Sequence, residues 1–161
     1  MPSNTTVLEL RGDREIVITR AVNASARVVF DAWTKPEFVR RWWAPKSRGV
    51  ALSLCDADLR EGGAYHYVMR RGDGREMAFS GTYKEFSPHS RLAYTQIFEP
   101  MRHMGETSVT VTFDEAAGAT KITSIEQYPS GQVRDAVLAT GMESGMRESM
   151  EQLENLIDEL Q

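Results

Sequence analysis

The sequence has almost no cysteine and no long apolar run. Cys55 is the only cysteine among 161 residues, so the chain cannot form an internal disulfide. It lies in the apolar stretch VALSLC, which favours a buried small side chain over a nucleophile. No stretch approaches the roughly 20 apolar residues of a membrane-spanning helix, and no N-terminal stretch resembles a signal peptide. We therefore expect a cytoplasmic protein without a membrane span.

Strong charge and catalytic motifs are also missing. The chain carries 19 Lys and Arg against 23 Asp and Glu, and the net charge of −4 gives no general attraction to nucleic acid. It has no glycine-rich phosphate loop and no G-x-S-x-G nucleophile motif. The three histidines (His66, His89 and His103) lack the spacing of metal ligands. We expect no metal, no cofactor and no nucleic-acid partner.

Two short helices are predicted to follow a first strand. Residues 15–23 alternate as a strand does, and Ser25 is placed to cap the first helix. Thr34, with a glutamate three residues later, matches the capping box of a second helix. The adjacent Trp42 and Trp43 share the apolar face of that helix, Trp42 near its middle and Trp43 at its edge. We expect Trp42 in the core and Trp43 at a rim.

From Arg48 onward, apolar residues recur at every second position, which predicts strands. The predicted strands are residues 49–55, 64–71, 77–86, 91–98, 107–114 and 120–127. Short turns separate them, so together with the first strand they predict an antiparallel sheet of about six to seven strands. Residues 1–14 are expected to form a loose N-terminal arm, and residues 15–161 a single domain.

A single long helix is predicted at the C-terminal end, because no proline follows Pro129. Its apolar stripe loses bulk where Gly141, Gly145 and Ser149 follow one another at intervals of four. Glycine in a helix interior costs about 1 kcal/mol relative to alanine. Either backbone or a ring packs closely into this notch, or the notch faces a cavity between helix and sheet.

The residues opposite the notch favour the cavity. Large inward groups of the sheet and flexible methionines of the helix are typical of a small-molecule pocket. The helix wall would consist of Gly141, Met142, Gly145, Met146 and Ser149, and the sheet wall of Tyr65, Tyr67, Phe79, Tyr83 and Tyr94. Trp43 would form the rim, and His103 would lie at the mouth on the EPMRHMGE loop.

Glu126 is the one acidic residue predicted to point inward late in the last strand, in phase with Ile122 and Ser124. A buried carboxylate is either a candidate base or ligand anchor, or the partner of an arginine in a salt bridge. The structural salt bridge is the expected role.

Several motifs occur in an order that resembles a known family. VFDAWTKPEFVRRWWAP, DLREGGAYHYVMRRGDG, FSGTYKEFSPHSRLAYT and the final glycine-containing helix resemble the activator of Hsp90 ATPase homologue-like family, in the START/Bet v 1-like (SRPBCC) superfamily. The resemblance implies an α+β helix-grip fold: a curved antiparallel sheet around a long C-terminal helix, with two short helices after the first strand and a deep apolar cavity. Relatives carry tryptophan where this chain has Met146, so we expect a roomier cavity.

Three functions remain open after this resemblance. The leading hypothesis is binding of a small hydrophobic or aromatic molecule, a lipid included, whose identity the sequence does not give. The second is a polyketide cyclase- or hydrolase-like enzyme that uses Glu126 or a tyrosine for acid–base work in the same cavity. The third is a chaperone-interacting protein, which requires an exposed apolar patch. The sequence is compatible with both a monomer and a homodimer.

Overall fold

The computed structural model describes residues 5–161. Its elements follow in the order β1 (Val7–Arg11), β2 (Glu15–Val22), α1 (Ala26–Thr34), α2 (Pro36–Trp42), η1 (Lys46–Arg48), β3 (Val50–Ala57), β4 (Ala64–Arg71), β5 (Glu76–Ser87), β6 (Arg91–Phe98), η2 (Glu99–Met104), β7 (Thr107–Ala116), β8 (Ala119–Gln127), α3 (Gly131–Ala139) and α4 (Met142–Leu160).

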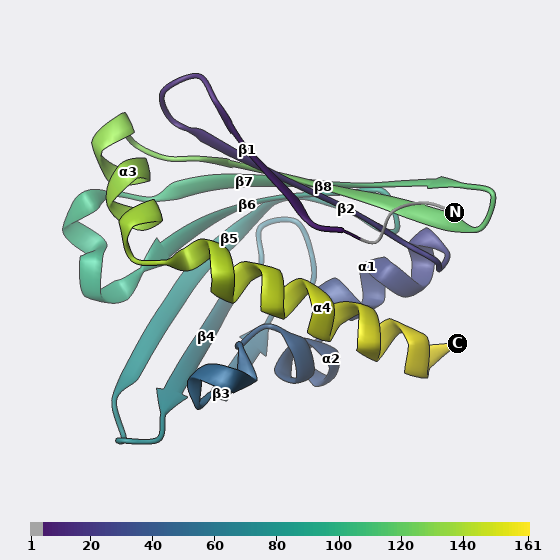
Figure 1. Ribbon diagram of the computed structural model, residues 1–161, viewed down its shortest axis with the longest axis horizontal. Helices are drawn as coiled ribbons and strands as arrows, with labels where there is room; N and C mark the ends of the chain where they lie inside the picture. The colour runs from purple at the N-terminus through teal and green to yellow at the C-terminus, as the bar shows by residue number, and fades with distance from the viewer. Residues whose placement is uncertain (1–4) are drawn as a thin grey trace.

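Eight strands form one antiparallel sheet in the order β1-β2-β8-β7-β6-β5-β4-β3. The sheet curves around α4, and α1 and α2 pack on the same side as α4 (Figure 1). The expected α+β helix-grip architecture is confirmed. Within residues 5–161, no helix is both long enough and apolar enough to span a membrane.

The strands after Arg48 were predictable from their alternation. The six predicted segments are β3 to β8, and two of them, Ala64–Arg71 and Arg91–Phe98, have the predicted bounds. Residues 7–11, however, form strand β1 rather than a loose arm, paired with β2 from Val7↔Thr19 to Arg11↔Glu15. Leu8 and Leu10 do alternate with Glu9 and Arg11, but this short edge strand buries few side chains, so the pattern is too brief to be distinctive. Residues 1–4 of the expected arm lie outside the described residues.

The helix starts follow local backbone chemistry. The Ser25 hydroxyl accepts a hydrogen bond from the Val28 amide at 3.4 Å, so Ser25 caps α1 as predicted. Thr34 does not cap α2, because it is the last residue of α1 and its hydroxyl donates to the Phe30 carbonyl at 2.9 Å. A residue that precedes proline favours extended backbone, and Lys35 therefore takes the cap position of α2.

The predicted single C-terminal helix is wrong, because the chain breaks between α3 and α4. Gly141 has φ 80°, the left-handed conformation that glycine adopts most readily, and its amide donates to the Leu138 carbonyl at 3.2 Å. Gly141 is therefore the joint between two helices and not part of a continuous apolar stripe.

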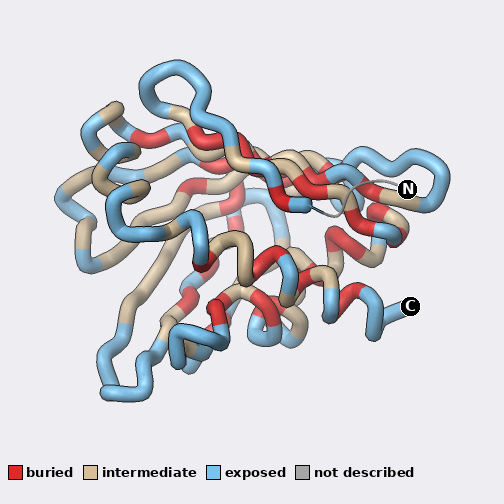
Figure 2. The backbone as a smooth tube through the Cα atoms, in the orientation of Figure 1, coloured by how far each residue is buried: buried red, intermediate tan, exposed pale blue. Residues whose placement is uncertain are grey.

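The apolar core lies between the sheet and the C-terminal half of α4, where Leu153 and Ile157 are buried. Figure 2 shows buried backbone along this part of α4, whereas α3 has no buried residue. Trp42 belongs to this core, as predicted: it is 4% exposed, and its Nε1–H donates to the Ala32 carbonyl at 2.8 Å. The apolar residues of α3 (Val133, Val137 and Leu138) are only partly buried against this core.

Candidate functional site

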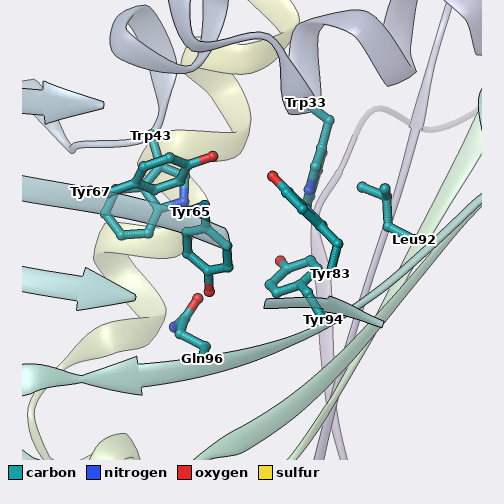
Figure 3. Close-up of a pocket in the computed structure, with 8 residues that line it drawn as sticks. All are labelled: Trp33, Trp43, Tyr65, Tyr67, Tyr83, Leu92, Tyr94 and Gln96. Atoms are coloured by element: carbon teal, nitrogen blue, oxygen red, sulfur yellow. The ribbon is translucent and has the colours of Figure 1, made fainter. Parts of the chain in front are cut away.

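Four tyrosines gather on the inner face of the sheet. Tyr65 and Tyr67 come from β4, Tyr83 from β5 and Tyr94 from β6 (Figure 3). The Tyr65 ring is central, with its centroid 5.0 Å from that of Tyr67, 5.6 Å from that of Tyr83 and 5.7 Å from that of Tyr94. Strand alternation aims all four inward, as the sequence predicted.

A glycine makes the central position of Tyr65 possible. Gly81 is the register partner of Tyr65. A Cβ added to Gly81 would lie 2.7 Å from the Tyr65 ring and 1.8 Å from the Thr95 carbonyl oxygen. Because Gly81 has no side chain, the Tyr65 hydroxyl reaches across β5 and donates to that Thr95 carbonyl at 2.8 Å.

The tyrosine hydroxyls form hydrogen bonds with other groups of the protein. Tyr67 and Tyr83 hydrogen-bond each other, and Tyr94 is hydrogen-bonded to the Trp33 side chain. Burial raises the pKa of all four tyrosines, that of Tyr83 to about 12. At neutral pH they are therefore uncharged hydroxyls that orient polar atoms in an otherwise apolar space.

These rings enclose a cavity of about 20 Å³, close to the space that one water molecule needs. It is lined by Trp33, Trp43, Tyr65, Tyr67, Tyr83, Leu92, Tyr94 and Gln96. The deep cavity implied by the family resemblance is thus mostly filled by side chains in this structure. Trp33, Leu92 and Gln96 were not among the predicted site residues, although Leu92 and Gln96 share the inward alternation of Tyr94.

Trp43 lines this cavity and is partly exposed, so its role as a rim residue stays a prediction. Its ring packs edge-on against Tyr67 and Phe79, with centroids 5.3 and 4.9 Å away. Phe79 therefore supports the cavity through Trp43 and does not line it. The exposed His103 lies on η2 and does not line the cavity either.

The predicted helix wall does not face this cavity. The Ser149 hydroxyl donates to the Trp43 carbonyl at 2.9 Å. A Cβ on Gly145 would lie 3.2 Å from the Arg48 guanidinium carbon and 3.3 Å from Pro45. The notch is therefore filled by close packing of the segment between α2 and β3. Met142 and Met146 are partly buried against the core, but they do not line the cavity.

We expect Gly145→Leu to lower the free energy of unfolding by about 1–2 kcal/mol, because overpacking outweighs the roughly 1 kcal/mol gained by replacing a helical glycine. The new side chain would displace Arg48 from its hydrogen bonds to the Gly141 carbonyl and the Ser144 hydroxyl. Urea denaturation measures the change. Glu151→Leu, on the exposed face of α4, adds the same side chain outside the notch and is the control. Stabilisation by Gly145→Leu would show free space at this position.

Glu126 points inward, but it has no arginine partner among residues 5–161. The Tyr128 hydroxyl donates to Glu126 Oε1 at 2.8 Å, and burial raises the pKa of the carboxyl. The expected salt bridge is absent because Arg20, the inward arginine of the neighbouring strand β2, pairs with Glu154 of α4, Nη2 to Oε2 at 3.3 Å. Glu126 is therefore a partly buried acid without a cationic partner among residues 5–161, and it does not line the cavity itself.

This environment predicts a pH-dependent effect of Glu126→Gln on stability. A raised pKa means that the folded state holds the proton more tightly than the unfolded state, whose value is near 4.5. At about pH 4 both states are mostly protonated and the substitution has little effect, whereas at about pH 8 folding must either desolvate the charge or take up a proton, and glutamine avoids both costs. We expect the variant to melt higher than wild type at the upper pH only. Equal destabilisation at both pH values would contradict this, since glutamine can still accept from Tyr128.

The antiparallel sheet curved around α4 gives this protein the Bet v 1-like helix-grip fold, with an aromatic cavity on the inner face of the sheet. The chain belongs to the family described as Activator of Hsp90 ATPase homolog 1-like protein, whose model matches residues 23–158. The resemblance noted in the sequence is thereby confirmed.

Solved bacterial structures show the same fold. A protein from Rhodobacter sphaeroides is 22% identical with a TM-score of 0.88, and the match covers 95% of this chain and 98% of that one. A protein from Arthrobacter aurescens is 23% identical with a TM-score of 0.84, over 95% of this chain and 91% of that one. Protein Ms6760 from Mycobacterium smegmatis is 22% identical with a TM-score of 0.82, over 94% and 96%. Comparison with curated proteins gave no match.

Proposed function

We propose that this protein binds a small hydrophobic or aromatic molecule between the rings of the inner sheet face, and that it does so in the cytoplasm, where a free cysteine such as Cys55 stays reduced. The observation that carries the proposal is the cavity itself. Its walls consist mainly of aromatic rings, with a few oriented hydroxyl groups among them. Apolar walls with few polar groups are typical of ligand pockets.

A ligand larger than water must displace some of these rings. Tyr65, Tyr67 and Tyr83 are buried, whereas Trp43 and Tyr94 are partly exposed and have more room to move. The ligand would replace ring–ring contacts with ring–ligand contacts and bury its own apolar surface, at about 25 cal/mol per Å². Such a site favours flat or flexible apolar molecules with few polar atoms.

Titration with the neutral apolar dye N-phenyl-1-naphthylamine tests this proposal. We expect saturable binding to the wild-type protein. Gln96→Trp places a large ring in the cavity lining, and we expect it to weaken dye binding by about tenfold or more. Gln127→Trp makes the same exchange at an exposed position of β8 and should leave the affinity unchanged. Absence of saturable binding, or equal affinities in all three proteins, would refute a binding site here.

A cyclase- or hydrolase-like activity is the second candidate, and one observation favours it. Glu126 is a partly buried carboxyl with a raised pKa and no cationic partner in residues 5–161, and such groups serve as general acids or bases. Under this alternative, Glu126→Gln retains affinity for a substrate and loses turnover. A substrate with that behaviour would replace simple binding as the function.

A further inference from the structure

The Glu126 carboxyl and the tyrosines belong to one row of paired residues across the sheet. Tyr83 pairs with Tyr94, Tyr94 with Val109, and Val109 with Glu126. Directly paired residues of antiparallel strands have their side chains on the same face. Glu126 therefore shares the inner face with the rings, two strands away from Tyr94.

Glu126 also interacts electrostatically with that cluster. Its charge contributes to the raised pKa of Tyr94, after the larger contribution of burial. The two titratable groups that face Glu126, Tyr94 from β6 and Tyr128 from beyond β8, are both neutral phenols. The inward Arg20 is held by Glu154 and by the Thr6 hydroxyl. The described chain thus places a carboxyl on the ring-lined face without any cation beside it.

Only one oxygen of this carboxyl has a partner in the described part of the chain. Oε1 accepts from the Tyr128 hydroxyl at 2.8 Å, and no residue of 5–161 donates to Oε2. Glu126 is partly buried, and a carboxylate that loses water is unfavourable unless an opposite charge or further donors compensate it. A ligand that brings a positive donor to Oε2 would supply this compensation.

We propose that the ligand carries a protonated amine next to its aromatic or apolar body, with the body among the tyrosines of the cavity and the amine on Glu126, which lies on the same sheet face just outside the cavity lining. The inference rests on the proposed binding function and names its ligand class. The tyrosine and tryptophan rings reinforce the selection, because the faces of aromatic rings attract cations. A ligand with a carboxylate at the same place is disfavoured, since it would bring two negative charges together.

Three probes of similar size separate charge from shape: 2-phenylethylamine, propylbenzene and 3-phenylpropanoate. Calorimetric titration of the wild-type chain is expected to give an affinity for the amine about tenfold or more above that for either other probe. Glu126→Gln should reduce the amine affinity to that of propylbenzene and leave propylbenzene binding unchanged. Glu151→Gln removes the same charge from the exposed face of α4 and should change neither.

The outcomes distinguish this inference from the proposed function. If propylbenzene binds wild type as tightly as the amine does, the site is apolar only, and the amine inference alone is overturned. If none of the three probes binds, the binding function is overturned together with the inference. The comparison of probes on wild type needs no variant, so it remains decisive even if Glu126→Gln folds poorly.

Discussion

We expect Trp42→Ala to lower the free energy of unfolding by about 3–5 kcal/mol, the usual range for truncating a buried large aromatic residue. Trp42 is 4% exposed, and its ring lies 5.0 Å from that of Trp33 between centroids. Truncation would leave a cavity beneath α1 and α2. It would also remove the donor to the Ala32 carbonyl, which then stays unpaired inside the protein.

The neighbouring Trp43→Ala is the matched comparison, because it removes the same side chain one position later. Trp43 is only partly buried and packs by its edge against Tyr67 and Phe79. We expect a clearly smaller loss of stability and a larger change in dye affinity than for Trp42→Ala. Urea denaturation and dye titration of both variants measure this. Equal losses of stability, with neither variant altered in binding, would contradict the division into core and rim.

The second large effect is expected at Gly81, where Gly81→Ala should lower the free energy of unfolding by about 3 kcal/mol, the upper end of the range for overpacking. The added Cβ would lie 1.8 Å from the Thr95 carbonyl oxygen, which is backbone and cannot rotate away. Strands β5 and β6 would have to separate, and Tyr65 would lose its hydrogen bond to Thr95.

Gly72→Ala is the control for this substitution. Gly72 lies in the turn after β4, its φ is not positive, and a Cβ there meets no atom within 4 Å. We expect a change within about 0.5 kcal/mol, as for surface positions without special contacts. Thermal unfolding of both variants measures the difference. A Gly81→Ala protein as stable as Gly72→Ala would mean that β5 and β6 are not held together as described.

The sheet side of the candidate site could be predicted from the sequence, and the helix side could not. Period-two alternation is a local property of the strand, so it aimed Tyr65, Tyr83 and Tyr94 inward without any knowledge of the fold. An apolar stripe on a helix indicates only that this face of the helix is buried, and does not indicate which residues pack against it. Pro45 and Arg48 cover Gly145, and no local pattern announces a contact about a hundred residues away along the chain.

The break at Gly141 and the partner of Glu126 were missed for related reasons. A glycine that ends a helix and a glycine that lets two elements pack closely look the same in a sequence. Which acid an inward arginine pairs with depends on how the helix packs on the sheet, and this packing places Glu154 of α4, rather than Glu126, beside Arg20 of β2. Long-range competition of this kind is decided by tertiary structure alone.

The joint at Gly141 also separates two helices, α3 and α4, that differ in the free energy needed to unfold them. Helix α3 has no buried residue, and Arg134 fastens its first turns to the β1–β2 hairpin through the Gly12 carbonyl at 3.0 Å. The apolar residues of α3 (Val133, Val137 and Leu138) are only partly buried, so opening α3 should require less free energy than unfolding α4, whose Leu153 and Ile157 are fully buried. We therefore expect the backbone amides of α3 to exchange their hydrogens with solvent through local opening. Substitutions that strengthen the core would slow exchange in α4 and leave exchange in α3 as it is.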